Sequence, residues 1–150
     1  LGLSTSDPGD LALVRDLLDA MRDSSVDFTL AFRGLCAAAG DPAADAAMRR
    51  LFASPEAYDA WATRWRERLA TEPLPPAERA ARMRAVNPAF IPRNHRVEQA
   101  LSAAVDRGDF APFEELVAVV RRPFEDQSGR EAYATPPRPE ERVLQTFCGT

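Results

Sequence analysis

The sequence contains no lysine, because all 19 of its basic residues are arginines. A chain without lysine cannot supply the lysine of a P-loop, of a kinase-type phosphate site or of a Schiff base. Its seven glycines are scattered rather than gathered in a loop that could cradle phosphate groups. Each of these chemistries would therefore have to come from residues outside this chain.

Histidine and cysteine are also scarce. His95 is the only histidine and has no partner at a metal-binding or catalytic spacing, so we favour a structural or surface role for it. The two cysteines, Cys36 and Cys148, are too few for a disulfide framework. Cys36 is expected to be a small core residue within a helix. Cys148 lies near the end of the chain, where an exposed thiol would be chemically available, and it is our redox candidate.

Long apolar runs and excess positive charge are missing as well. No apolar run approaches the roughly 20 residues of a membrane span. The net charge of −4 disfavours a nucleic-acid-binding surface, which is usually basic. The chain begins without methionine and has no signal-peptide pattern. We therefore expect part of a longer protein that binds neither membrane nor nucleic acid. The richness in arginine and alanine is consistent with a bacterial cytoplasm, which is the location we expect.

Helical periodicity is the dominant positive signal. Apolar residues recur at spacings of three and four, which predicts helices over 10–23, 27–39, 41–52, 54–69, 77–86, 95–107 and 111–121. Asp27 is a plausible N-cap, and Gly108 follows the end of the sixth helix. Pro88 and Pro92 predict an extended or turn segment. The residues after 123 should be irregular, with a short extended piece at Val143-Leu144.

These signals predict an all-α protein with six to seven short helices and an irregular tail. The first predicted helix should bury Leu11, Val14, Leu17, Leu18 and Met21. The last two predicted helices should bury Val97, Leu101, Ala104, Val105, Phe113, Leu116, Val117 and Val120.

Trp61 and Trp65 lie one helical turn apart among arginines, which would suit a base-stacking platform. The helical period and the acidic net charge favour core anchors instead. Arg121 and Arg122 stand at a predicted helix C-terminus, where they would interact with the helix dipole or dock an acidic surface. Paired carboxylates such as Glu114 and Glu115 could act in acid–base chemistry, but the helical pattern favours solvated helix faces.

Several motifs occur in a specific order. They are Leu1-Gly2-Leu3, the stretch DFTLAFR from Asp27, Asn87-Pro88, Arg93-Asn94, Gly108-Asp109-Phe110, Arg122-Pro123-Phe124 and the terminal Phe147-Cys148-Gly149-Thr150. This series resembles the C-terminal region of the selenoprotein O family, also called YdiU or UPF0061, over nearly the whole chain. The sequence departs from that family at Gly149-Thr150, where the family has Ser-Ser, and at His95, where we expect an aromatic or another residue.

The resemblance implies a parent enzyme with a protein-kinase-like fold that binds ATP with Mg²⁺ or Mn²⁺. Such an enzyme transfers AMP to Ser, Thr or Tyr hydroxyls of protein substrates. The family's catalytic, nucleotide-binding and metal-binding motifs belong to the kinase-like domain, so we expect no such residue in this chain. Cys148 matches a terminal cysteine that can form a disulfide with a cysteine in that domain and so regulate activity.

The expected organisation has three parts. Residues 1–86 would pack on the C-lobe of the upstream kinase-like domain, 87–123 would form a loop and two helices, and 124–150 would be a tail bearing Cys148. A free-standing helical module that binds a partner helix remains the alternative. An exposed apolar patch larger than a monomer usually shows would favour a part of a larger protein.

Overall fold

The computed structural model describes residues 1–143 of the 150-residue chain, and every regular element within that range is a helix. This confirms the predicted all-α class. The chain divides into two compact units, Leu1–Asn87 and Pro88–Thr150. Both the predicted redox residue Cys148 and Leu144, half of the predicted extended piece, lie outside the described residues.

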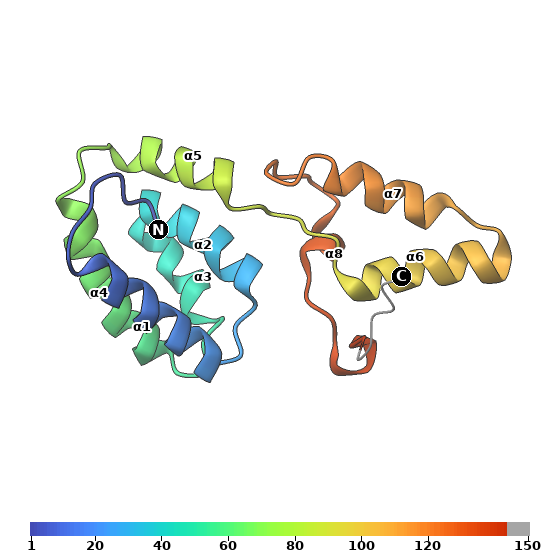
Figure 1. Ribbon diagram of the computed structural model, residues 1–150, viewed down its shortest axis with the longest axis horizontal. Helices are drawn as coiled ribbons and strands as arrows, with labels where there is room; N and C mark the ends of the chain where they lie inside the picture. Colours follow the sequence, from blue (N-terminus) through green and yellow to red (C-terminus); the bar gives the residue numbers. More distant parts are fainter. Residues whose placement is uncertain (144–150) are drawn as a thin grey trace. The chain divides into compact units, whose positions relative to one another are not determined.

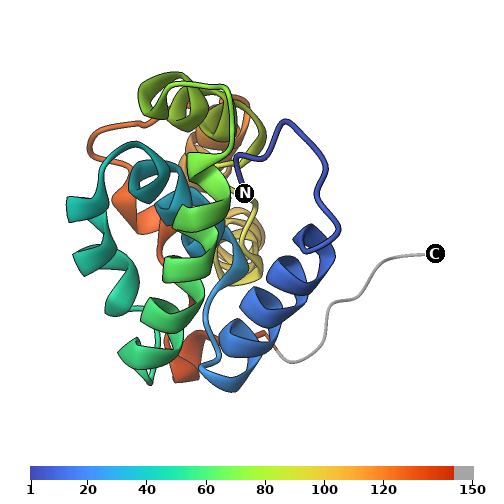
Figure 2. The ribbon, with the colours of Figure 1, turned by 90° about the vertical axis from the view of Figure 1, so that its left-hand side faces the viewer.

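The first unit contains five α-helices and one 3₁₀ turn. They are α1 (Asp10–Asp23), α2 (Phe28–Gly40), η1 (Pro42–Ala44), α3 (Asp45–Arg49), α4 (Pro55–Ala70) and α5 (Pro76–Val86). Helix α1 lies beside α4, and α2 lies beside α5 (Figures 1 and 2). These pairings enclose one core.

Local sequence signals explain the helix boundaries of this unit. The Asp27 carboxylate accepts a hydrogen bond from the Leu30 N–H at 2.9 Å, so Asp27 is the predicted N-cap of α2. The prediction of one continuous helix over 41–52 is wrong, because this segment is divided into η1 and α3. Asp41 has an extended backbone and accepts from the Ala43 N–H at 2.9 Å, which produces the turn η1 before the short α3. Helix α3 ends at Arg49, before the predicted end of the helix.

Aromatic side chains form the centre of the first unit. Trp61 and Trp65 are buried and stacked, with ring centroids 5.2 Å apart. The Trp61 indole N–H donates to the Leu13 carbonyl at 2.8 Å, and the Trp65 indole N–H donates to the Leu1 carbonyl at 2.9 Å. Because both rings are covered and both N–H groups are used internally, the two tryptophans are core anchors, as expected.

Helix α1 buries only part of the predicted stripe. Leu13, Leu17 and Met21 are buried, whereas Leu11 and Leu18 are exposed. Spacings of three and four residues are helical, so both sets fit a helix, but the sequence alone does not say which part of a wide apolar band faces α4.

The second unit consists of a helical hairpin and a structured tail. Its elements are α6 (Asn94–Arg107), α7 (Ala111–Val120), α8 (Glu131–Ala134) and the 3₁₀ turn η2 (Pro139–Glu141). Helices α6 and α7 lie side by side (Figure 1). Gly108 ends α6 with φ of +65°, and its N–H donates to the Ala104 carbonyl at 3.0 Å, the C-cap geometry expected of glycine.

The tail predicted to be irregular contains two short helical elements within the described residues, α8 and η2. Helix α8 follows Gly129, whose N–H donates to the Glu131 carboxylate at 3.0 Å. The turn η2 is closed by the Glu141 carboxylate, which accepts from the Arg138 N–H at 3.0 Å. Such short turns depend on local capping bonds and leave no helical periodicity in the sequence.

Candidate functional site

The strongest polar cluster surrounds Glu72, which follows α4. Its carboxylate is fully covered and accepts hydrogen bonds from the Ser4 N–H at 2.7 Å, the Ser4 hydroxyl, the Thr5 hydroxyl at 2.6 Å and the Arg68 guanidinium at 2.7 Å. The hydroxyls of Ser4 and Thr5 are the main reason why the pKa of Glu72 lies well below its ordinary value. The cluster attaches the first residues of the chain to the end of α4.

Arg68 extends this cluster to the start of α1. Its Nε donates to Asp10 at 2.7 Å, and its Nη2 donates to the Thr5 carbonyl at 2.8 Å. The hydrogen bond from Arg68 lowers the pKa of Asp10. Strongly shifted pKa values often mark active sites. Here the shifts arise from contacts that hold the chain together, so we assign these groups a structural role.

Cys36 is a buried thiol on α2. It donates to the Phe32 carbonyl at 3.2 Å and lies 3.6 Å from the Asn87 amide nitrogen. Burial raises the pKa of Cys36, which keeps the thiol protonated and weakly nucleophilic. The structure thus places Cys36 in the core, as expected.

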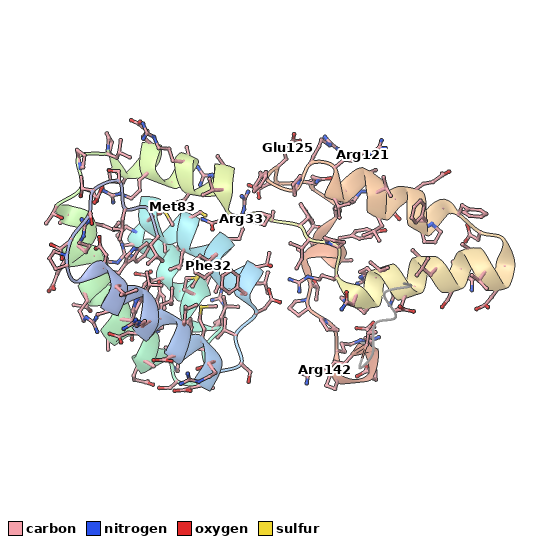
Figure 3. All side chains as sticks on the ribbon, viewed as in Figure 1. Phe32, Arg33, Met83, Arg121, Glu125 and Arg142 are labelled. Atoms are coloured by element: carbon pink, nitrogen blue, oxygen red, sulfur yellow. The ribbon has the colours of Figure 1, made fainter. Side chains whose placement is uncertain are left out.

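The neighbouring Arg33 points to the C-terminal end of α5 (Figure 3). It donates to the Arg84 carbonyl at 3.1 Å and to the Asn87 carbonyl at 3.0 Å. A cation at a helix C-terminus caps unpaired carbonyls and interacts favourably with the helix dipole. Arg33 therefore links α2 to α5.

His95 is buried at the start of α6, and its Nδ1 atom has no hydrogen-bond partner among the described residues. Burial and the nearby Arg96 lower the pKa of His95, so the imidazole stays neutral near pH 7. Within residues 1–143, no group of three or more His, Cys, Asp or Glu residues is arranged to hold a metal ion. The position of His95 fits the predicted structural role.

Arg121 and Arg122 follow the end of α7 at Val120. Arg122 pairs with Glu125 at 3.3 Å, and more than half of each of these two side chains is exposed. Such a solvated pair contributes little stability. Both interpretations of the basic pair, helix-dipole contact and docking of an acidic surface, stay predictions.

Among residues 1–143, none of the helices combines the length and the apolar character that a membrane crossing requires.

The largest departure from the sequence prediction is an apolar surface on the α6–α7 pair. Leu101 and Val105 on α6 and Phe113 on α7 were expected to point inward. They are instead 47%, 81% and 46% exposed. The reason is that the small second unit buries only a narrow line on each helix.

Helical geometry places these exposed residues on one side of the hairpin. The buried line runs through Ala100 and Ala103 on α6 and through Leu116 and Val119 on α7. In an antiparallel pair of helices, residues that are rotated in the same direction about their own helix axis, away from the buried line, lie on the same side of the pair. That side carries Val97, Leu101, Val105, Phe113 and Val117, which we call the hairpin apolar face.

The tail of the second unit contacts the hairpin along its buried line and on the side opposite the hairpin apolar face. Arg130 pairs with Glu115 of α7, and Arg96 of α6 donates to the Ala132 carbonyl at 2.9 Å. The Arg96 guanidinium also lies 5.9 Å from the centre of the Tyr133 ring. The described tail therefore leaves the hairpin apolar face uncovered, and this face is the best candidate for a functional surface in the second unit.

Comparison with known proteins identifies the relatives of this chain. The sequence matches the family described as Protein adenylyltransferase SelO over residues 1–121. The chain belongs to the SelO family. It is 61% identical over 150 residues to Protein nucleotidyltransferase YdiU of Bradyrhizobium diazoefficiens. It is 57% identical to the protein of the same name from Rhodopseudomonas palustris strain BisB18 and 55% identical to that from Rhizobium meliloti.

These matches cover all of this chain but only part of each relative. Each aligns with 100% of this chain, but this chain spans only 30% or 31% of the relative's length. The SelO family resemblance predicted from the ordered motifs is confirmed. The shared region is therefore a minor part of the whole relative.

Proposed function

We propose that this chain is the non-catalytic C-terminal part of a protein adenylyltransferase. The parent enzyme would transfer AMP from ATP, with Mg²⁺ or Mn²⁺, to Ser, Thr or Tyr hydroxyls of protein substrates in a bacterial cytoplasm. Its kinase-like domain, outside this chain, would hold the nucleotide and the metal. Residues 1–86 would pack on the C-lobe of that domain, 87–123 would form the loop and hairpin, and 124–150 would carry the regulatory Cys148.

One observation carries the assignment of a supporting role. The carboxylate with the most strongly shifted pKa in the first unit, Glu72, accepts hydrogen bonds from Ser4, Thr5 and Arg68. A group that is fully bonded within its own chain is not free to bind a nucleotide or to move a proton. Transfer of a nucleotide group uses cationic side chains such as lysine on the phosphates and metal ions held by carboxylates. The lack of lysine in the sequence therefore agrees with a nucleotide site outside this chain.

Adenylylation with labelled ATP and Mg²⁺ or Mn²⁺ tests the proposal. This chain alone should transfer no AMP, whereas the full-length protein should label a protein acceptor. The full-length Cys148→Ala variant should lose the difference in activity between reducing and oxidising conditions, whereas Cys36→Ala should retain it. AMP transfer by this chain alone would refute the supporting role, and an unchanged redox response in Cys148→Ala would refute the regulatory role.

A further inference from the structure

The hairpin apolar face is unusual in its concentration of exposed apolar groups. Single exposed apolar side chains are normal on a protein surface, but contiguous patches mark interaction sites. Here Leu101, Val105 and Phe113 are all exposed, and Phe110 at the hairpin turn is 59% exposed. The two helices therefore present an apolar band with no covering element among the described residues of the second unit.

The shape and margin of this band indicate the chemistry of its partner. The band lies on the outer side of two packed helices, whereas the hollow beside His95, Gln99 and Ser102 lies on the other side, next to Glu141. A small ligand would bind in a hollow rather than on an outer helix surface. On α7, Glu114 lies one turn before Val117 and Arg121 one turn after it, and both are exposed at the margin of the band. An apolar band with charged groups of both signs at its margin matches the apolar core and polar rim of a protein–protein interface.

The extent of the chain indicates which protein supplies that partner. Because this chain spans 30% of the length of its YdiU relatives, more than two thirds of such a protein lies outside it. We infer that the hairpin apolar face docks on an apolar surface of that remaining part. This inference rests on the proposed function, since it requires that the chain is one part of a longer enzyme.

Cysteine labelling in the full-length protein tests the docking directly. Val105→Cys and Phe113→Cys place a thiol on the hairpin apolar face. Ser102→Cys on α6 and Ala118→Cys on α7 place a thiol at exposed positions on the other side of the same helices. The labelling rate of each thiol by a maleimide is measured by peptide mass spectrometry, which separates it from Cys36 and Cys148. Each variant is measured in the full-length protein and in this 150-residue chain.

Docking predicts that the thiols at 105 and 113 react about tenfold or more slowly in the full-length protein than in this chain. The thiols at 102 and 118 should react at similar rates in both. Equal rates at all four positions in both proteins would overturn the inference. Protection at 105 and 113 that rises with protein concentration would also overturn it, because a second copy would then cover the face. AMP transfer by the unsubstituted full-length protein tests the proposed function separately.

Discussion

The two units of this chain reach stability in different ways. The first unit buries two tryptophans and a tyrosine at its centre and attaches its first residues through Glu72 and Arg68. The second unit has a small cluster of Ala89, Phe90 and Val119 and leaves much of its apolar surface exposed. The difference indicates that the first unit can hold its fold with its own contacts, whereas the second has apolar surface available for a partner.

The largest expected effect lies in the core of the first unit. Trp65→Ala should lower the free energy of unfolding by about 3–5 kcal/mol, because it opens a cavity at a fully buried site and removes a hydrogen bond to Leu1. Denaturant unfolding followed by far-UV circular dichroism measures this loss. Leu11→Ala, at an exposed position on α1, is the control. A loss below about 1 kcal/mol in Trp65→Ala would contradict the central role of this ring.

A core substitution in the second unit should cost less. Leu116→Ala should destabilise that unit by about 2 kcal/mol, the low end for leucine, because a shallow core can collapse around the gap. Both tryptophans belong to the first unit, so their fluorescence should report its unchanged unfolding midpoint, while circular dichroism reports both units. Phe113→Ala, at an exposed position, is the control for helix α7. A shift in the fluorescence midpoint equal to the circular dichroism shift would show that the units unfold together.

The attachment of the first residues depends on the charge of Glu72. Glu72→Gln should lower the free energy of unfolding by about 1–3 kcal/mol, because an amide cannot accept all the bonds that Ser4, Thr5 and Arg68 donate. Glu78→Gln is the matched control, since it removes only a solvated pair with Arg82 and should cost about 0.5 kcal/mol or less. Equal losses of unfolding free energy in the two variants would show that the Glu72 cluster contributes no more than a solvated ion pair.

The two units should also respond to acid in different ranges. The pKa of His95 lies below its unfolded value of 6.5, so the unfolded state binds a proton that the folded state does not, and the second unit should weaken as the pH falls through 6.5. The pKa of Glu72 lies below its unfolded value of 4.5, so its contribution should be lost only as the pH falls below that value. Unfolding by tryptophan fluorescence and circular dichroism from pH 8 to pH 3 should show this order. His95→Gln should remove the response near pH 6.5, and an unchanged response would contradict its origin in His95.

The smallest effect is expected at the hairpin apolar face of this chain by itself. Val105→Ser should change the free energy of unfolding by about 0.5 kcal/mol or less, because the side chain is already 81% exposed. The same denaturant titration measures it, with Ala103→Ser at a fully buried position on α6 as the contrasting variant. A large loss in Val105→Ser would show that Val105 is covered in this chain.

Most of the fold was predictable because local signals determine it. The predicted first helix coincides with α1 (Asp10–Asp23), and the predicted cap Asp27 caps α2. The turns at η1, α8 and η2 were missed because side chain to backbone bonds within a few residues produce them without apolar periodicity. Glu72 was missed for another reason: its partners Ser4 and Thr5 lie more than 60 residues away in the sequence.

The sequence by itself determined the helical class, the helix boundaries at clear caps and prolines, and the family to which the chain belongs. Each of these depends on residue order or on contacts within a turn. Only the tertiary structure decided that Glu72 joins the first residues to α4, and that Leu101, Val105 and Phe113 face outward. Helical periodicity marks an apolar side of a helix, but burial depends on whether another element packs against it, and the small second unit supplies cover for only one narrow line.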